Sequence, residues 1–184
     1  MIGTKPMNTE QLVECLQKGG VAILRTDTLY GLVARIDDEQ AVEKIYELKG
    51  RDYDKPCIVL IPDASYVPAH LEVINRLTEK YKGIPTSILV PKSTEPGWIT
   101  RGQDSVAYRI PQDENVRAVL KKTGPIIAPS ANPQGLPPAK SIREAREYFG
   151  ESVDAYLDGG EVSPEIVASQ LIQVNTDGSE IKLR

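Results

Sequence analysis

Apolar residues recur with the period of an α-helix in five segments of the chain, each bounded by residues that typically begin or end a helix. The first segment starts after Asn8-Thr9, which can cap the free amides of a first helical turn, and ends at Gly19-Gly20. The same pattern predicts helices over residues 39–49, 71–81, 115–122 and 141–149. Ser141 and Glu144 have the spacing of a capping box, which fixes the start of the last helix.

Short apolar runs lie between these helices and are typical of buried strands. They occupy residues 21–24, 57–61, 87–90, 106–110, 126–128, 170–174 and 180–183. Residues 91–104 are rich in Pro, Gly, Ser and Thr, which predicts a long surface loop. Helices that alternate with short strands predict an α/β fold, here one domain over residues 1–184 with helices flanking a twisted, open, mixed β-sheet. The long irregular loops argue against a regular doubly wound strand order.

The composition excludes several classes of protein. The chain has 184 residues, 40% of them hydrophobic and 26% charged, as in ordinary globular domains and unlike disordered chains. With 22 Lys and Arg against 26 Asp and Glu, the net charge of −4 argues against nucleic-acid binding by overall charge alone. The single histidine, His70, cannot supply a histidine-rich zinc site, and HExxH, CxxC, GxGxxG and P-loop motifs are absent from the sequence.

Neither a secretory leader nor a membrane-spanning segment is expected. The first six residues lack the apolar core of a signal peptide, and the longest apolar run, residues 57–61, is far too short to cross a bilayer. Cys15 and Cys57 each lie within an apolar pattern and are predicted to be buried thiols in a reducing compartment. These features predict a cytoplasmic protein.

Three cations, Lys49, Arg51 and Lys55, lie close together in the loop between a predicted helix and a predicted strand. Flexible ammonium groups and a forked guanidinium can converge on one polyanion, so this arrangement suits phosphates. The alternative is a solvated loop in which the cations pair with Asp52 and Asp54. The loop alone does not decide between these interpretations.

A second candidate, Ser130-Ala131-Asn132, is enclosed by Pro129 and Pro133 directly after a predicted buried strand. It presents a hydroxyl and an amide in a stiff frame at the carboxyl end of a strand, where open α/β sheets commonly bind ligands. The alternative is an ordinary turn in which the Ser or Asn side chain bonds to the nearby backbone.

Arg109 lies in the apolar strand over residues 106–110, where an unpaired cation is costly. It therefore has an anionic partner, for which a ligand carboxylate would serve, or it occupies a solvent-facing position. Thr26, Thr28 and Tyr30 follow the first strand and supply neutral donors and acceptors, either to a ligand or to a turn and the core.

Four segments of the chain are more informative together than separately. They are Arg25-Thr26-Asp27-Thr28-Leu29-Tyr30-Gly31-Leu32, Lys49-x-Arg51 with Lys55-Pro56, Val106-Ala107-Tyr108-Arg109, and Ser130-Ala131-Asn132 with Gly135. In order and spacing this combination resembles the YrdC/TsaC family of threonylcarbamoyl-AMP synthases, from the first helix to Arg184. The resemblance implies a single-domain YrdC-like fold with a concave ligand cleft.

The resemblance also implies an activity. The family's nucleotidyltransferases form threonylcarbamoyl-AMP and pyrophosphate from L-threonine, bicarbonate or CO2, and ATP, and the product is an intermediate for threonylcarbamoyladenosine modification of tRNA. ATP would be a substrate, and Mg2+ would bridge its phosphates without a dedicated carboxylate cage, Asp27 being the nearest acidic candidate. Expected partners are these small molecules and the downstream tRNA threonylcarbamoyl transferase machinery, with direct tRNA binding weak or absent and no membrane contact.

Carried over by motif position, the resemblance also implies roles for individual residues. Thr26, Tyr30 and Arg109 would bind threonine, the last through its carboxylate. Lys49 and Arg51 would be catalytic, holding triphosphate and carboxylate charge. The expected ATP-binding residues are Lys49, Arg51, Lys55, Ser130, Asn132 and Arg184. Residues 163–166 correspond to a loop that the family places near threonine.

The sequence departs from the family pattern at several positions. Arg25 and Asp52 stand where proline is usual, and the C-terminal loop over residues 163–168 lacks the usual Ser-Thr pair. These departures bear on threonine specificity more than on nucleotide binding.

Two other functions remain open. A carbamoyl-adenylate-forming domain of the HypF type would share the fold and the cation cluster. A non-catalytic RNA-binding module would use the same concave face, but the acidic charge balance and an aromatic content of 5% disfavour it.

Overall fold

The structure, a computed structural model, describes residues 7–184. Residues 1–6, on which the expectation about a signal peptide rests, lie outside the described residues. The helices are α1 Thr9–Gln17, α2 Glu39–Lys49, α3 Leu71–Lys80, α4 Gly97–Thr100, α5 Glu114–Thr123 and α6 Ile142–Phe149. The strands are β1 Ala22–Arg25, β2 Tyr30–Arg35, β3 Val59–Leu60, β4 Thr86–Pro91, β5 Ser105–Arg109, β6 Ile126–Ile127, β7 Ala155–Leu157, β8 Gln170–Val174 and β9 Glu180–Lys182. Short 3-10 turns occupy Ala64–Tyr66, Pro68–His70 and Gly150–Ser152.

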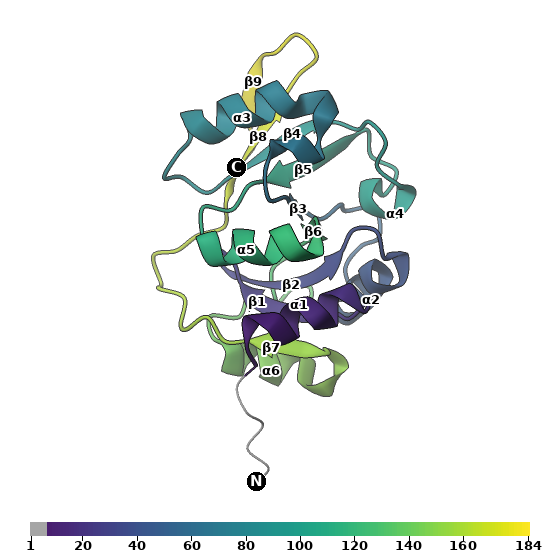
Figure 1. Cartoon of the computed structure of the whole chain (residues 1–184), viewed down its shortest axis with the longest axis vertical. Coiled ribbons are helices and arrows are strands. Elements are labelled where there is room, and N and C mark those ends of the chain that lie inside the picture. Colours follow the sequence, from purple (N-terminus) through teal and green to yellow (C-terminus); the bar gives the residue numbers. More distant parts are fainter. Residues whose placement is uncertain (1–6) are drawn as a thin grey trace.

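Within residues 7–184 the strands form one open sheet in the order β7-β1-β2-β6-β3-β5-β4-β8-β9 (Figure 1). The pairs β1 with β7, β3 with β5, and β4 with β8 are parallel, and the remaining neighbours are antiparallel. The predicted mixed sheet flanked by helices is therefore confirmed. Its strand order also differs from a doubly wound sheet, as the long loops indicate.

The helix starts follow the predicted capping chemistry. The Asn8 side chain accepts from the Gln11 amide at 2.9 Å, and the Gln11 side chain accepts from the Asn8 amide at 3.0 Å. At the start of α6, the Ser141 hydroxyl accepts from the Glu144 amide at 3.2 Å. The Glu144 side chain accepts from the Lys140 amide at 2.8 Å and not from the Ser141 amide, so the second half of the predicted capping box is not formed. Every helix of residues 7–184 is too short or too polar to span a lipid bilayer.

Three elements differ from the sequence prediction. The prediction of one continuous loop over residues 91–104 is wrong, because α4 forms there, fixed by the buried Ile99 and by a 2.9 Å hydrogen bond from the Trp98 indole to the Ile36 carbonyl. β2 was not predicted, because Gly31 interrupts the apolar run over residues 29–34, yet the strand is buried along almost its whole length. β7 was missed because three residues are too few to show a period.

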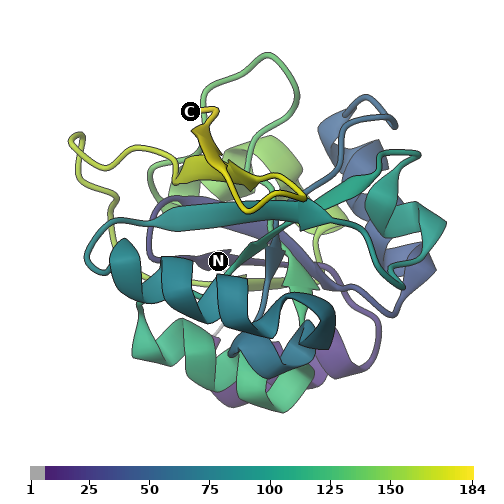
Figure 2. The same cartoon turned by 90° about the horizontal axis from the view of Figure 1, so that it is seen from above.

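Helices α1, α3 and α5 lie side by side along one face of the sheet, as both views show (Figures 1 and 2). Alternation along β4 and β5 turns Ile88, Val106 and Tyr108 into the core with α3 residues. The same alternation turns Leu89 and Arg109 to the opposite face, where the site is formed.

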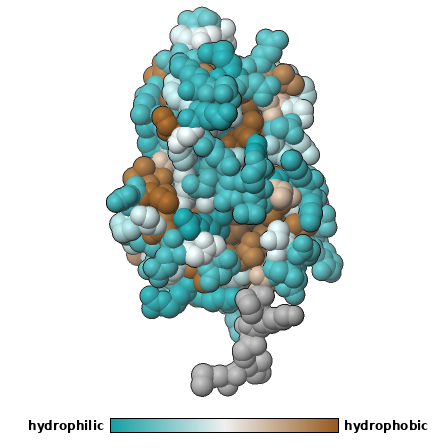
Figure 3. Space-filling view, turned by 60° about the vertical axis from the view of Figure 1, so that its left-hand side comes forward, coloured by the Kyte–Doolittle hydropathy of each residue, from teal (hydrophilic) through white to brown (hydrophobic). Residues whose placement is uncertain are grey.

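The surface seen in Figure 3 is mostly hydrophilic, with small separate hydrophobic areas. Most apolar side chains are instead buried in two clusters between the sheet and its helices. Both cysteines are free thiols; Cys57 is buried as predicted, whereas Cys15 is only half-buried.

Candidate active site

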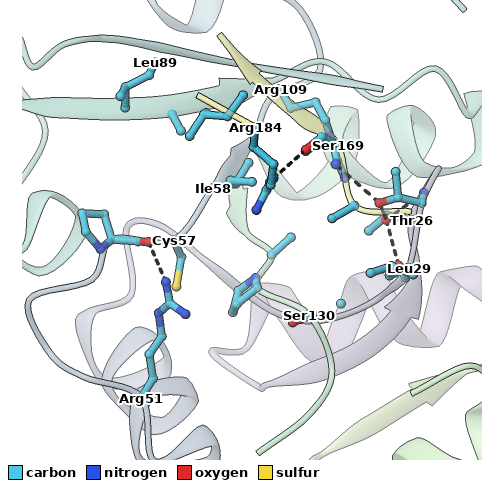
Figure 4. A pocket seen from close by; sticks show the side chains of 18 of the residues that line it. Thr26, Leu29, Arg51, Cys57, Ile58, Leu89, Arg109, Ser130, Ser169 and Arg184 are labelled. Carbon is cyan, nitrogen blue, oxygen red and sulfur yellow. Dashed lines mark hydrogen bonds between the residues drawn. The ribbon is translucent and has the colours of Figure 1, made fainter. Parts of the chain in front are cut away.

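A cleft of about 470 Å³ opens on the face of β4 and β5 opposite α3 (Figure 4). Its walls come from the turn after β1, the loop after α2, the segment after β6, and the C-terminal strands. Six of the predicted site residues line it: Thr26, Tyr30, Arg51, Arg109, Ser130 and Arg184. The volume lies in the range typical of small-molecule sites. The fold thus brings together residues that are more than 150 positions apart in the sequence.

Arg109 is held in a buried ion pair. Its side chain is 5% exposed, and its guanidinium lies 3.1 Å from the carboxylate of Asp27, which is 7% exposed. The Thr28 hydroxyl lies 3.5 Å from the same guanidinium. Burial lowers the pKa of Arg109, Asp27 opposes that shift, and the nearby charge of Arg184 adds to it. A solvent-facing position for Arg109 is therefore excluded, and the required anion is an internal carboxylate.

Two further guanidinium groups line the same cleft. Arg51 donates from Nε to the Lys55 carbonyl at 3.0 Å and from Nη2 to the Pro56 carbonyl at 3.0 Å. Arg184 donates from Nε to the Ser169 carbonyl at 3.0 Å. These bonds hold Arg51 through Nε and Nη2 and Arg184 through Nε alone. Figure 4 shows Arg51 and Arg109 on opposite sides of the cleft, with Arg184 reaching in between them.

The Ser130 and Asn132 side chains bond to each other and to the nearby backbone. The Ser130 hydroxyl donates to Asn132 Oδ1 at 2.6 Å, and the Asn132 amide donates to the Leu136 carbonyl at 2.7 Å. Ser130 lines the cleft, whereas Asn132 does not. Ser130 and Asn132 thus form a turn in which their side chains bond locally. Binding of the nucleotide by Asn132 stays a prediction.

Lys49, the last residue of α2, lies behind this turn and does not line the cleft. Its side chain is buried, and its ammonium donates to the carbonyls of Ser130 and Asn132, the latter at 2.6 Å. Burial, with a contribution from the nearby Arg51, lowers the pKa of Lys49 to about 8. The ammonium therefore supports the Ser130–Asn132 turn, and direct contact with phosphate stays a prediction.

The lowered pKa of Lys49 predicts a pH dependence of stability. Between about pH 8 and the ordinary lysine value of 10.5, the unfolded state binds more protons than the folded state. Lys49 should therefore make the free energy of unfolding rise with pH in this range, by at most about 1.4 kcal/mol per pH unit, and contribute no slope below it. Urea unfolding of the wild type and Lys49→Met across this range isolates the effect. Identical pH profiles would contradict it.

Lys55 lies at the exposed edge of the loop and does not line the cleft. Its ammonium is 2.5 Å from the Asp52 carboxylate, and this hydrogen bond lowers the pKa of Asp52. Asp52 also accepts at Oδ1 from the Gln134 side chain at 3.3 Å, while its amide donates to Gln134 Oε1 at 3.1 Å. Asp52, which stands where the family usually has proline, is thus held by hydrogen bonds to two side chains.

Thr26 and Tyr30 use their hydroxyls within the protein. Thr26 donates to the Leu29 carbonyl at 2.8 Å, which closes the turn after β1. Tyr30 is fully buried; its hydroxyl donates to the Gly160 carbonyl at 2.8 Å and accepts from the Gly159 amide at 3.0 Å. Burial raises the pKa of Tyr30. Both residues line the cleft, and Tyr30 in addition fastens the segment after β7 to the sheet.

Removing the Tyr30 hydroxyl should loosen this attachment. Tyr30→Phe is expected to lower the free energy of unfolding by about 1–2 kcal/mol, because the ring remains but the bonds to residues 159 and 160 are lost. Urea denaturation measures the change. Tyr66→Phe, on an exposed tyrosine, is the matched control and should stay within about 0.5 kcal/mol. A Tyr30→Phe effect as small as the control would show that the hydroxyl is not structural.

Several cleft residues carry no sequence signal. Cys57, Ile58, Leu89 and Leu171 line the cleft as apolar members of strands or their flanks. Ser169, also in the lining, shares a 2.9 Å hydrogen bond with the buried Ser87 hydroxyl. Among residues 7–184 there is also no group of three or more His, Cys, Asp or Glu side chains placed to hold a metal ion.

The chain is similar to known proteins in sequence and in fold. The model of the Sua5/YciO/YrdC family, described as "Telomere recombination", matches residues 14–184. The chain belongs to this family. Threonylcarbamoyl-AMP synthase of Cellvibrio japonicus is 34% identical over 152 residues, 78% of this chain and 79% of that protein.

Two further similarities in the Sua5/YciO/YrdC family involve a longer protein. Threonylcarbamoyl-AMP synthase of Pyrococcus abyssi is 35% identical over 79% of this chain, which spans only 45% of that protein. The crystal structure of P. abyssi Sua5 complexed with L-threonine superposes with a TM-score of 0.83 at 31% identity, over 98% of this chain and 55% of that one. The chain thus spans about half of the P. abyssi protein and about four fifths of the C. japonicus protein.

Proposed function

We propose that this chain is a threonylcarbamoyl-AMP synthase, which forms threonylcarbamoyl-AMP and pyrophosphate from L-threonine, CO2 or bicarbonate, and ATP. The observation that carries the proposal is the convergence of Arg51, Arg109 and Arg184 in one cleft of a Sua5/YciO/YrdC fold. The names of the C. japonicus and P. abyssi relatives support it. Three cations in one concave site suit substrates that carry a carboxylate and a triphosphate.

The reaction requires two anions to approach each other. The threonine amine adds to CO2 and loses a proton, and an oxygen of the resulting carbamate attacks the α-phosphorus of ATP. The bond between the α-phosphorus and the oxygen that bridges it to the β-phosphorus breaks, and pyrophosphate leaves with the electron pair of that bond. Fixed guanidinium groups lower the repulsion and stabilise the leaving group. The step needs no protein nucleophile; burial raises the pKa of Cys57, so this thiol stays neutral in the cleft wall.

The two sides of the cleft suit different substrates. On one side, Arg109, Thr26 and Thr28 surround a space that suits the threonine carboxylate and hydroxyl. On the other side, Arg51 and Ser130 suit the phosphates of ATP, and Arg184 between them can reach either substrate. Lys49 acts by holding the Ser130–Asn132 turn. Lys55 would have to leave Asp52 before it could contact a phosphate.

Mg2+ and the downstream steps are part of the same proposal. The described residues offer no cage for a metal, so Mg2+ would enter as the MgATP substrate, bound to phosphate oxygens. The product would pass in the cytoplasm to tRNA threonylcarbamoyl transferase machinery. With a net charge of −4, we expect weak direct binding of tRNA.

Pyrophosphate release tests the proposed function. The purified chain is incubated with MgATP, bicarbonate and L-threonine, and each substrate is omitted in turn. We expect release only with all three, and no release when carbamoyl phosphate replaces threonine and bicarbonate. Turnover with carbamoyl phosphate would favour HypF-type chemistry. Release that does not depend on threonine would overturn the substrate assignment. Salt-sensitive RNA binding without ATP turnover would favour an RNA-binding module.

A further inference from the structure

Arg101, outside the cleft, combines an unusual backbone conformation with a buried charge. It follows α4 with φ 53° and ψ 36°, and among residues 7–184 it is the one non-glycine residue with positive φ. L-residues avoid this region because the side chain crowds the backbone. Its side chain is only 8% exposed. Such a conformation persists where the surroundings fix it, and it often marks a functional constraint.

The guanidinium of Arg101 is held mainly by stacking. It lies 3.8 Å from the ring centroid of Tyr46 and 5.7 Å from that of Tyr53. The two rings are themselves stacked, 5.7 Å apart with an interplanar angle of 13°. One nitrogen pairs with Glu43 at 2.7 Å, whereas Nε and Nη2 have no hydrogen-bond partner among the described residues. A planar guanidinium over aromatic faces is favourable, and a lysine ammonium cannot reproduce that stack.

This stack connects directly to the loop that carries Arg51. The Tyr46 hydroxyl donates to the Lys55 carbonyl at 2.9 Å, and Arg51 Nε donates to the same carbonyl at 3.0 Å. Tyr53 belongs to the loop itself. A second attachment comes from the Gln103 side chain, which donates to the Asp54 carbonyl at 3.2 Å. Residues 101 and 103 therefore hold the loop over residues 51–56 at two separate points.

We propose that Arg101 is a positioning residue for Arg51, which it orients toward the triphosphate of ATP through Tyr46 and the Lys55 carbonyl. The proposal rests on the proposed function, and it adds a residue that does not line the cleft. Arg101 fixes the Tyr46 ring, Tyr46 fixes the Lys55 carbonyl, and that carbonyl sets the direction of the Arg51 guanidinium. Arg101 thereby influences the nucleotide side of the cleft, while the side containing Arg109 is unaffected.

Two variants separate this role from simple folding. Arg101→Gly removes the stack at a backbone conformation that glycine adopts readily, so the fold should persist. Arg101→Lys keeps a charge that can pair with Glu43 but loses the planar stack. In both we expect kcat/KM for ATP to fall about tenfold while KM for threonine changes by less than about twofold. The matched control is Arg143→Lys, on an exposed arginine of α6, which should change neither.

The decisive comparison places Arg101→Gly in an Arg51→Ala background. If Arg101 acts through Arg51, the double variant should lose no more ATP-dependent activity than Arg51→Ala alone. Independent losses that multiply would overturn the proposal, as would an equal rise of KM for both substrates. Tyr46→Phe, which keeps the ring but cannot bond to the Lys55 carbonyl, should show the same selective loss.

Calorimetric titration of MgATP distinguishes this inference from the proposed function. If the wild type shows no threonine-dependent turnover, the proposed function fails, yet the dissociation constant for MgATP still tests Arg101. An increase of about tenfold in both Arg101 variants, absent from Arg143→Lys, supports the positioning role. An unchanged dissociation constant together with unchanged kcat/KM for ATP overturns it.

Discussion

Replacing Arg109 with Leu should reduce threonine-dependent pyrophosphate release by at least about a hundredfold and lower the free energy of unfolding by about 3–5 kcal/mol. The activity is lost because the buried guanidinium, 3.5 Å from the Thr28 hydroxyl, is the cation assigned to the threonine carboxylate. The stability is lost because the carboxylate of Asp27, 7% exposed, is left without its ion-pair partner. Steady-state pyrophosphate release and urea denaturation measure the two effects.

A double variant separates these two effects. Asp27→Asn combined with Arg109→Leu removes both charges, so much of the lost stability should return. Activity should not return, because the cation assigned to the threonine carboxylate, the guanidinium of Arg109, is missing. If Arg109→Leu retained turnover within about threefold of the wild type, Arg109 would be a purely structural partner of Asp27 and the threonine assignment would be wrong.

Arg51→Ala should lower kcat/KM for ATP by about a hundredfold to a thousandfold. The change removes a cation from the phosphate side of the cleft and also the two bonds that tie the guanidinium to the carbonyls of Lys55 and Pro56. Arg51→Lys should recover little, because an ammonium cannot donate in the same fork. Steady-state kinetics with varied ATP at saturating threonine measure the effect.

Lys55→Ala is the matched control for Arg51→Ala. Lys55 lies in the same loop, but it is exposed and paired with Asp52, so its removal should lower kcat/KM for ATP by less than about threefold. A larger loss with Lys55→Ala than with Arg51→Ala would contradict the arrangement of the phosphate side. It would indicate that the exposed lysine moves into the cleft when ATP binds.

Local patterns predicted the helices and most strands because each such element carries its own signal. The side chains of Asn8 and Ser141 each cap a helix by accepting from the amide three residues further on, so their chemistry is visible in the sequence. In β2 this signal is weakened by Gly31 inside the apolar run, and one edge of the strand pairs with β6, about 90 residues further along the chain. The short helix α4 depends on the contact of Trp98 with Ile36 and is likewise set by tertiary structure.

The site shows the same division between local and distant information. The family resemblance singles out Arg51, Arg109 and Arg184 from separate motifs, and the three line one cleft, while their roles toward substrates stay predictions. The sequence cannot show that Lys49 lies behind the Ser130–Asn132 turn, since the carbonyls that accept from its ammonium lie more than 80 residues further along the chain. Nor can it identify Arg101, whose role follows from stacking on Tyr46 in another helix.

The departures from the family pattern are also explained by contacts between distant segments. Asp52, which replaces a proline, gains bonds from Gln134 and Lys55 that fix the loop in another way. Arg25, which replaces a second proline, donates to the Gly159 carbonyl at 3.0 Å and helps Tyr30 hold the segment after β7. Both substitutions thus keep their loops attached to the sheet through side-chain bonds, where a proline would restrict the backbone directly.

Transfer of labelled carbon into the product tests the central claim most directly. The purified chain is incubated with 13C-bicarbonate, L-threonine and MgATP, and the nucleotide products are analysed by mass spectrometry. The proposed function predicts threonylcarbamoyl-AMP that carries the label, formed one-to-one with pyrophosphate by the wild type and absent with Arg109→Leu. Pyrophosphate release without labelled threonylcarbamoyl-AMP would contradict it.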